Sequence, residues 1–158
     1  MFGLKKKIKY DENLYSPVDG ELLNLEDVKD KVFSSKMMGD GFAVKPEIGI
    51  IAAPCDGIIT MVFPTNHAFA ITSSDGKEIL VHIGIDTVNL KGQGFESLVK
   101  QNEKVSLGQD VIRFDKNSVE KNHDITTMVV ITNAVSGKIN EQLLHKKVKV
   151  KELAMTFD

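Results

Sequence analysis

The chain has 158 residues, of which 42% are hydrophobic and 27% are charged, and its formal net charge is -2. This composition indicates one globular domain and excludes a disordered chain or a strongly basic nucleic-acid-binding protein. The single cysteine, Cys55, excludes an internal disulfide and a cysteine-built metal cluster. Because one cysteine fits a reducing compartment and no apolar run reaches transmembrane length, we expect a cytoplasmic protein.

The basic start of the chain, MFGLKKKIKY, has no apolar run behind it, so we do not expect it to be a signal peptide. We expect residues 1–14 to form a flexible basic segment. Its lysines have few apolar neighbours, so they would support only a weak contact with anionic lipid. Residues 15–158 contain no low-complexity linker, and we expect them to form a single domain.

Short segments rich in branched residues and bounded by Gly, Pro, Asp or Asn follow in chain order. GELLNL (20–25), GIITMVF (57–63) and EILVHIGI (78–85) are examples. Their close spacing predicts an all-β sandwich or barrel. FESLVKQ (95–101) and KNSVEKNH (116–123) are candidates for short helices.

An internal echo indicates duplicated hairpin units around one core. SPVDGELLNL (16–25) and APCDGIITMV (53–62) share a Pro-x-Asp-Gly turn followed by a strand-like run. We expect each Asp-Gly pair to supply the positive φ of a tight turn that starts a strand.

The segment around Asp75-Gly76 reads as a hairpin that carries two histidines. Asp-Gly suits a two-residue loop, and pairing outward from it places Phe69 opposite His82 and His67 opposite Gly84. The histidines are then diagonal neighbours on one face, about 7–8 Å apart. A three-residue loop with a bulge would shift the register by one and send them to opposite faces.

Two histidines with Thr65 on one face admit several interpretations. Either could be a hydrogen-bonded core residue, or His67, His82 and Asp86 could bind zinc, although no HxH or HExxH spacing is present. GxSxG and P-loop motifs are absent. Phosphoryl transfer on histidine fits better, because neutral imidazole is nucleophilic, a backbone carbonyl can hold its Nδ1–H, and the second imidazole and hydroxyl can stabilise phosphoryl oxygens. We expect no resident metal or cofactor.

Several motifs resemble the glucose-type IIA domain of the bacterial phosphoenolpyruvate-dependent sugar phosphotransferase system. They are TNHAFAI, VHIGIDTV followed by LxGxGF, KMMGDGFAVKP and the APCDG turn, and they extend from about Tyr15 to Thr132. The resemblance implies a flattened antiparallel β-sandwich of the barrel-sandwich hybrid type, with a duplicated hairpin and one or two short helices. It also implies a phosphotransferase component that takes a phosphoryl group from phospho-HPr and passes it to a IIB domain for sugar uptake.

By their place in these motifs, His82 is similar to the family's phosphorylated histidine, His67 to its supporting histidine, and Thr65 to the residue that hydrogen-bonds the supporting histidine. The resemblance also implies a shallow docking surface for HPr and IIB with two acidic residues, Asp30 and Asp86, at its rim. Its apolar members are Val32, Phe33, Met37, Met38, Phe63, Ile85 and Val88.

Two other functions stay open. A mainly regulatory IIA-like protein, whose phosphorylation state is read by metabolic enzymes or permeases, would keep the same site. A biotinyl- or lipoyl-type carrier would also be a small β-sandwich, and KVSLGQDVI (104–112) resembles its V-x-x-G-x-x-(L/I) element. Lys36 would then be the modified lysine, which leaves both histidines without a role.

Overall fold

The computed structural model describes residues 12–133 and 135–157. Its strands are β1 (Leu14–Tyr15), β2 (Gly20–Asn24), β3 (Asp40–Pro46), β4 (Ile50–Ala52), β5 (Gly57–Val62), β6 (Ala68–Ser73), β7 (Glu78–Ile83), β8 (Phe95–Ser97), β9 (Lys104–Val105), β10 (Asp110–Phe114), β11 (Thr127–Ile131), β12 (Lys138–Ile139), β13 (Lys147–Val148) and β14 (Leu153–Thr156). Its helices are η1 (Leu25–Asp27), α1 (Lys31–Ser34), η2 (Thr87–Leu90) and α2 (Lys116–Glu120), where η marks a 3-10 helix.

The basic segment and its predicted lipid contact lie largely outside the described residues. β1 already begins at Leu14, one residue before the predicted start of the domain, and Leu14 pairs with Met155 of β14. None of the helices in the described part of the chain is long and apolar enough to cross a membrane.

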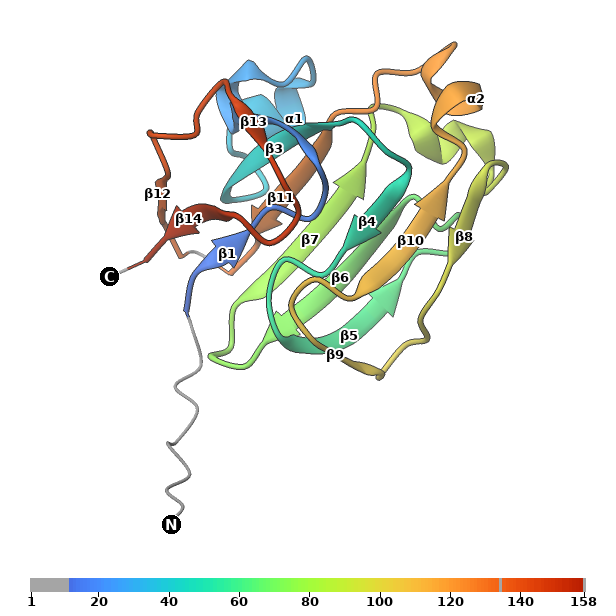
Figure 1. Cartoon of the computed structure of the whole chain (residues 1–158). Coiled ribbons are helices and arrows are strands. Elements are labelled where there is room, and N and C mark those ends of the chain that lie inside the picture. The colour runs from blue at the N-terminus through green and yellow to red at the C-terminus, as the bar shows by residue number, and fades with distance from the viewer. Residues whose placement is uncertain (1–11, 134, 158) are drawn as a thin grey trace.

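The strands form three antiparallel sheets (Figure 1). The largest has the order β13-β2-β3-β11-β7-β6-β5-β9, and the two smaller ones have the orders β4-β10-β8 and β1-β14-β12. One continuous core draws on all three sheets, with members such as Phe42, Phe69, Val81, Ile112 and Met155. The predicted all-β sandwich is therefore confirmed.

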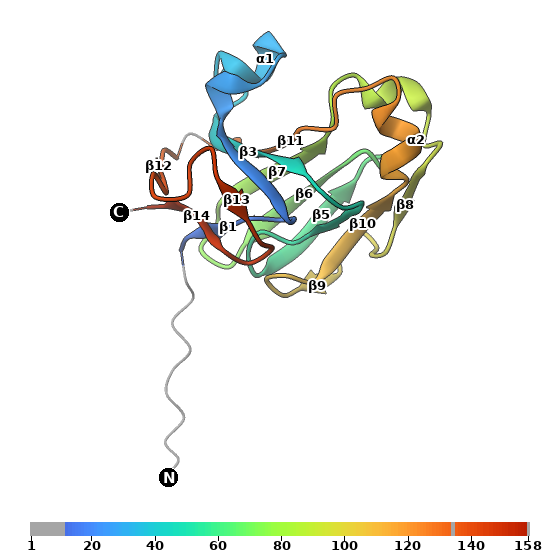
Figure 2. The same cartoon turned by 45° about the horizontal axis from the view of Figure 1, so that its top comes forward.

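The outer face of the large sheet carries a second, smaller cluster. Along β7, Ile79, Val81 and Ile83 belong to the main core, so alternation directs Leu80 and His82 to the opposite face. Near His82 this outer face is covered by η1, α1 and the segment between them, which project from one edge of the molecule in Figure 2. The cluster consists of Leu25, Val28, Phe33, Ala43, Met128 and Val130, with Leu23 and Ile85 packed against it.

The repeated Pro-x-Asp-Gly turns start equivalent strands, as the internal echo predicts. Gly20 opens β2 and Gly57 opens β5, and neither has a positive φ, so the expectation of left-handed turns at these glycines is wrong. The two aspartates instead close the turns against distant backbone. Asp19 Oδ1 accepts from Val150 N at 2.8 Å, and Asp56 Oδ1 accepts from Leu107 N at 2.6 Å.

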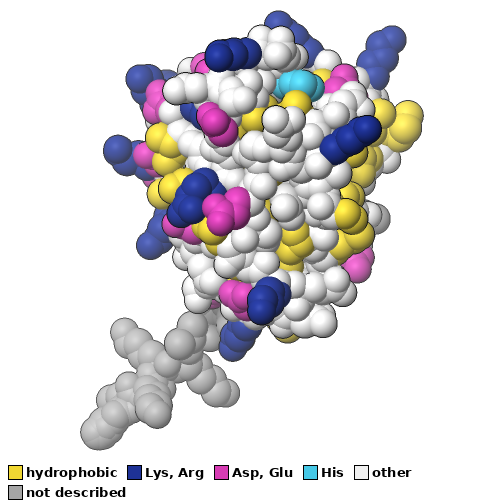
Figure 3. Space-filling model, turned by 90° about the vertical axis from the view of Figure 1, so that its right-hand side faces the viewer, with side chains coloured by type: hydrophobic (Ala, Val, Ile, Leu, Met, Phe, Trp, Pro, Cys, Tyr) yellow, Lys and Arg dark blue, Asp and Glu magenta, His cyan; other side chains and the backbone are white. Residues whose placement is uncertain are grey.

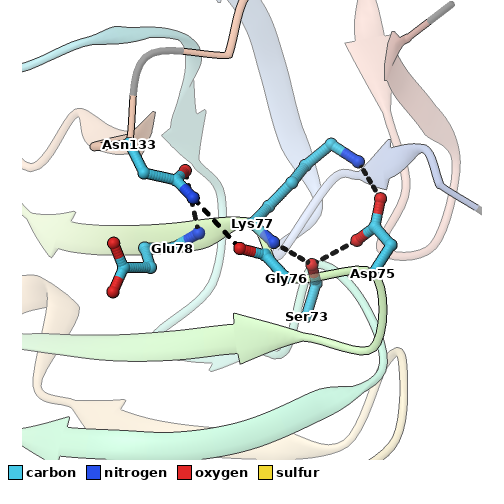
Figure 4. Close-up of polar contacts among 6 residues, drawn as sticks. All are labelled: Ser73, Asp75, Gly76, Lys77, Glu78 and Asn133. Carbon is cyan, nitrogen blue, oxygen red and sulfur yellow. Dashed lines mark hydrogen bonds and ion pairs between the residues drawn. The ribbon is translucent and has the colours of Figure 1, made fainter.

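The loop of the β6–β7 hairpin differs from the prediction. Ala68 lies opposite His82 and Thr72 opposite Glu78, so the register is shifted by one residue and the loop has three residues, 74–76. Ser73 closes this loop, because its hydroxyl accepts from Lys77 N at 2.9 Å and donates to Asp75, whose carboxylate also pairs with the Lys77 ammonium (Figure 4). A type I′ turn needs a positive φ at both central residues, and only Gly76 has one (+90°).

Of the two predicted helices, one exists. Lys116–Glu120 forms α2, capped by Asp115, whose side chain accepts from Ser118 N. The predicted helix at 95–101 is wrong, because β8 occupies its first half. Phe95 lies opposite Phe114 of β10, and their rings stack with centroids 5.7 Å apart.

Candidate functional site

His82 lies on the outer face of β7, between two strands that pack closely beside it. Its neighbours in the sheet are Ala68 on β6 and Met128 on β11. The small Ala68 leaves room above β6 for a second ring. On the other side, the Phe33 ring from α1 lies with its centroid 5.0 Å from that of His82. The imidazole is therefore held between the edge of the second cluster and β6.

His67 immediately precedes β6, and its side chain does not follow the alternation of side chains between the two faces of the sheet. In the observed register it lies opposite Ile83, whose N–H donates to the His67 carbonyl at 2.8 Å, and strict alternation would point it into the core. However, Asn66 has a left-handed φ of +56° and closes a turn by donating to the Phe63 carbonyl at 2.8 Å. Regular strand geometry ends here, and the His67 and His82 rings meet edge to face with centroids 4.9 Å apart.

The two imidazoles are oriented through their Nδ1 atoms. His82 Nδ1 lies 2.9 Å from the Gly84 carbonyl oxygen, which can only accept, so Nδ1 carries the proton and Nε2 keeps its lone pair. His67 Nδ1 lies 2.5 Å from the Thr65 hydroxyl, which can donate or accept. Phe63 packs edge-on against His67, with centroids 5.6 Å apart. The structure thus brings Thr65, His67 and His82 together as the sequence predicted.

Burial keeps both rings neutral near pH 7. The pKa of His82 falls to about 4, mainly because burial penalises the imidazolium and secondly because His67, when it is protonated, repels a second positive charge. The Gly84 hydrogen bond and the charges of Asp30 and Asp86 act in the opposite direction. Burial also lowers the pKa of His67. A neutral His82 with a free Nε2 lone pair is the form that can attack an electrophile.

The predicted docking residues surround this pair unevenly. Asp30 caps α1 by accepting from Val32 N at 2.9 Å. The negative charges of Asp30 and Asp86 act to raise the pKa of His82. Phe63 and Ile85 are half-buried. Phe33 is only 5% exposed, so it supports the site from below instead of forming its surface. The exposed apolar members are Val32, Met37, Met38 and Val88, with Met37 the most exposed at 78%.

An apolar hollow that the sequence analysis missed extends the surface beyond Phe63. It encloses about 330 Å³, and its lining includes Met61, Ala70, Leu80 and Thr132. Alternation from His82 to Leu80 along β7 was a usable signal for Leu80. Met61 follows a register shift between Ile59 and Met61 on β5, which no local pattern indicates.

Charges of both signs are interspersed over the molecule. On the side that carries β8 and α2, positively and negatively charged side chains are scattered, and hydrophobic side chains lie at both margins (Figure 3). This mixture fits the net charge of -2.

The other chemistries considered from the sequence find little support. Within residues 12–133 and 135–157, no three His, Cys, Asp or Glu side chains are close enough to hold a metal ion, so Asp86 does not complete a site with the histidines. Lys36, the position that a carrier domain would modify, follows α1 and forms ion pairs with Glu26 and Asp40 at 3.6 and 3.3 Å. It does not lie at a hairpin tip.

Comparison with known proteins identifies the family. Residues 12–136 match the family described as phosphoenolpyruvate-dependent sugar phosphotransferase system, EIIA 1. The chain is 42% identical to the PTS system glucose-specific EIIA component of Halalkalibacterium halodurans, over 98% of this chain and 94% of that relative. The chain belongs to the EIIA 1 family. The phosphocarrier function and the sandwich fold implied by its motifs are those of this family, and both predictions are confirmed at that level.

Longer relatives and a solved structure agree with this assignment to the EIIA 1 family. The chain is 47% identical to the PTS system glucose-specific EIICBA component of Staphylococcus carnosus, over 86% of this chain, and it spans about a fifth (20%) of that relative's length. The solved glucose permease IIA from Mycoplasma capricolum is 34% identical, with a TM-score of 0.81, covering 96% of this chain and 98% of that one.

Proposed function

We propose that this EIIA chain accepts a phosphoryl group from phospho-HPr on Nε2 of His82 and passes it to a IIB domain of a glucose-type permease. The observation that carries the proposal is the paired geometry of the two histidines, with centroids 4.9 Å apart and His82 Nδ1 held by the Gly84 carbonyl. The unit that performs this function is the predicted domain of residues 15–158, located with its partners in the cytoplasm.

In the first step the Nε2 lone pair of His82 attacks the phosphorus of phospho-HPr. The new N–P bond forms as the bond between phosphorus and HPr breaks, and the electron pair of the broken bond returns to the HPr atom that carried the phosphoryl group. His82 needs no deprotonation beforehand, because burial already keeps its ring neutral at pH 7. In the second step the IIB nucleophile attacks the same phosphorus, and the electron pair of the N–P bond returns to His82.

His67 stabilises the phosphoryl group in this scheme. When the Thr65 hydroxyl donates to His67 Nδ1, the proton of the His67 ring resides on Nε2 and can be donated to a phosphoryl oxygen. A Thr65 hydroxyl that donates in this way favours the Nε2–H tautomer of the supporting ring. Fixed donors of this kind act where negative charge is transferred, so their loss slows transfer more than it weakens docking.

Docking uses the exposed apolar residues around the pair. Val32, Met37 and Val88 are each more than two-fifths exposed, and Met37 and Met38 can adapt to two different partners in turn. Asp30 and Asp86 act on His82 with negative charge, which opposes a phosphoryl dianion. A partner that brings basic groups to this rim would neutralise them while it is docked.

Phosphorylation with purified components tests the proposal. The parent, His82→Gln, His67→Gln and the control His145→Gln, an exposed histidine paired with Asp27, are incubated with phosphoenolpyruvate, enzyme I and HPr. Intact mass should show one acid-labile phosphoryl group on all except His82→Gln. On addition of IIB and sugar, His67→Gln should lose its group more slowly than the parent. Unchanged phosphorylation of His82→Gln, or an unphosphorylated parent beside active relay proteins, would contradict the proposal.

A further inference from the structure

The tautomer of His82 depends on one peptide unit, the one that joins Gly84 to Ile85. The carbonyl of this unit lies 2.9 Å from His82 Nδ1. Its N–H, on Ile85, donates to the Asp124 carbonyl at 2.9 Å. A peptide unit is planar, with its C=O and N–H pointing in opposite directions. By accepting from Ile85 N–H, the Asp124 carbonyl therefore orients the Gly84 carbonyl, which accepts the hydrogen bond from His82 Nδ1–H.

The backbone around this peptide is held from two further sides. Gly84 N donates to the Thr126 carbonyl at 3.0 Å, and Gly84 has a φ of +80°. A Cβ at this position would meet Thr87 Cγ2 at 2.5 Å and the Asp124 carbonyl oxygen at 2.9 Å. Thr87 is fully buried and donates to the Ile83 carbonyl at 2.5 Å. Gly84 is thus confined between Thr87 and the 124–126 segment.

The 124–126 segment is itself closed by a side chain. Asp124 Oδ1 accepts from both Thr126 N at 2.9 Å and Thr126 Oγ1 at 2.7 Å. The segment precedes β11 and contains no helix or strand, and this carboxylate ties its first residue to its third. These bonds join Asp124 and Thr126, whose carbonyls accept from Ile85 N and Gly84 N.

We propose that Asp124 is a positioning residue for His82, which acts through Thr126 and the Gly84–Ile85 peptide to keep the proton on Nδ1 and the lone pair on Nε2. The proposal extends the proposed phosphoryl transfer, because it identifies the group that presents the nucleophile. Asp124 touches neither the imidazole nor the reacting atoms. Its effect is geometric, since the carboxylates whose charges act on His82 are Asp30 and Asp86.

Imidazole nitrogen NMR of the unphosphorylated protein tests this directly. Long-range proton–nitrogen spectra of 15N-histidine-labelled protein distinguish the two neutral tautomers. In the parent, His82 should be the Nδ1–H form. In Asp124→Ala, the ratio of Nε2–H to Nδ1–H should rise about tenfold. This is the change expected when the free energy of one hydrogen bond no longer favours the Nδ1–H form. Asp56→Ala, which removes a carboxylate that accepts from Leu107 N elsewhere, should leave the parental ratio.

A conservative variant separates geometry from charge and from general loss of structure. Asp124→Asn removes the charge but keeps an oxygen that can accept from Thr126, so it should restore both the parental tautomer and the parental rate of phosphorylation by phospho-HPr. Asp124→Ala should be phosphorylated several-fold more slowly than Asp124→Asn. A parental tautomer in Asp124→Ala, or an Asn variant indistinguishable from the Ala variant, would overturn the proposal.

A second pair of variants decides the matter if Asp124→Ala does not fold. Thr126→Val removes only the hydroxyl bond to Asp124, and should shift the His82 tautomer in the same direction by a smaller, roughly twofold to fivefold factor. Thr132→Val, at the opposite end of β11, removes a hydroxyl that donates to the Glu78 carbonyl and should have no effect. Equal spectra for both would overturn the proposal. Because the tautomer is read without phosphate, failure of phosphorylation alone would count against the proposed function, not against this inference.

Discussion

Burial of a neutral His82 makes the stability of the protein depend on pH in a defined window. The pKa of His82 is about 4 in the folded chain, against 6.5 for a free side chain, so the unfolded chain binds a proton more readily. Stability therefore rises with pH between about 4 and 6.5, and it is lost as the pH falls through this window. For this single group, the loss in unfolding free energy between pH 7.5 and pH 5 amounts to about 2 kcal/mol.

Urea unfolding of the parent and of His82→Gln at both pH values, followed by circular dichroism, isolates this contribution. Other titrating groups affect both proteins and cancel in the difference, so the parent should lose about 2 kcal/mol more than the variant on acidification. His67→Gln should retain most of the effect, because burial is the largest cause of the His82 shift and the charge of His67 is the second. Parallel losses in the parent and in His82→Gln would show that the His82 ring is not buried in its neutral form.

Three further predictions concern the site and the core. Thr65→Val should slow phosphoryl transfer to IIB by about tenfold, while the rate of acceptance from phospho-HPr changes less, because His67 loses the hydrogen bond that favours its Nε2–H tautomer when the hydroxyl donates. Equal slowing of both half-reactions in rapid-quench assays would contradict this. Met37→Glu should raise the Kd for HPr several-fold in calorimetric titrations, whereas Ile48→Glu, at another exposed apolar residue that lies outside the predicted surface, should not. Cys55 is buried and its pKa is raised to about 12, so native protein at pH 8 should react with a disulfide reagent about a thousandfold more slowly than unfolded protein; rapid native labelling would refute this.

The pairing of the histidines was predicted correctly although the register used to derive it was wrong. The Asp75-Gly76 pair fits a two-residue loop, but the Ser73 side chain bonds to Lys77 N and closes a three-residue loop instead. In that register strict alternation separates the rings. They meet because the turn ending at Asn66 releases His67 from the strand. The local sequence pattern predicts the two strands. It does not predict the hydrogen bond of the Ser73 side chain that sets the loop length, or the turn at Asn66 that changes the direction of His67.

The sequence also could not predict which residues of the docking surface are buried. Val32 and Phe33 are adjacent apolar residues in a short helix, and only the packing of η1 and α1 on the sheet decides that Phe33 is 5% exposed and Val32 44% exposed. FESLVKQ has helical spacing, yet Phe95 forms a strand because it stacks on Phe114, a residue distant in the chain. Long-range contacts of this kind override local preference.

The nitrogen that carries the phosphoryl group tests the central claim most directly. Protein labelled with 15N in its histidine rings is phosphorylated through enzyme I and HPr, and the phosphorus–nitrogen coupling is then recorded by NMR. The proposed mechanism predicts coupling to Nε2 of His82, with Nδ1 of the same ring still protonated against the Gly84 carbonyl. Coupling to Nδ1 of His82, or to either nitrogen of His67, would contradict it.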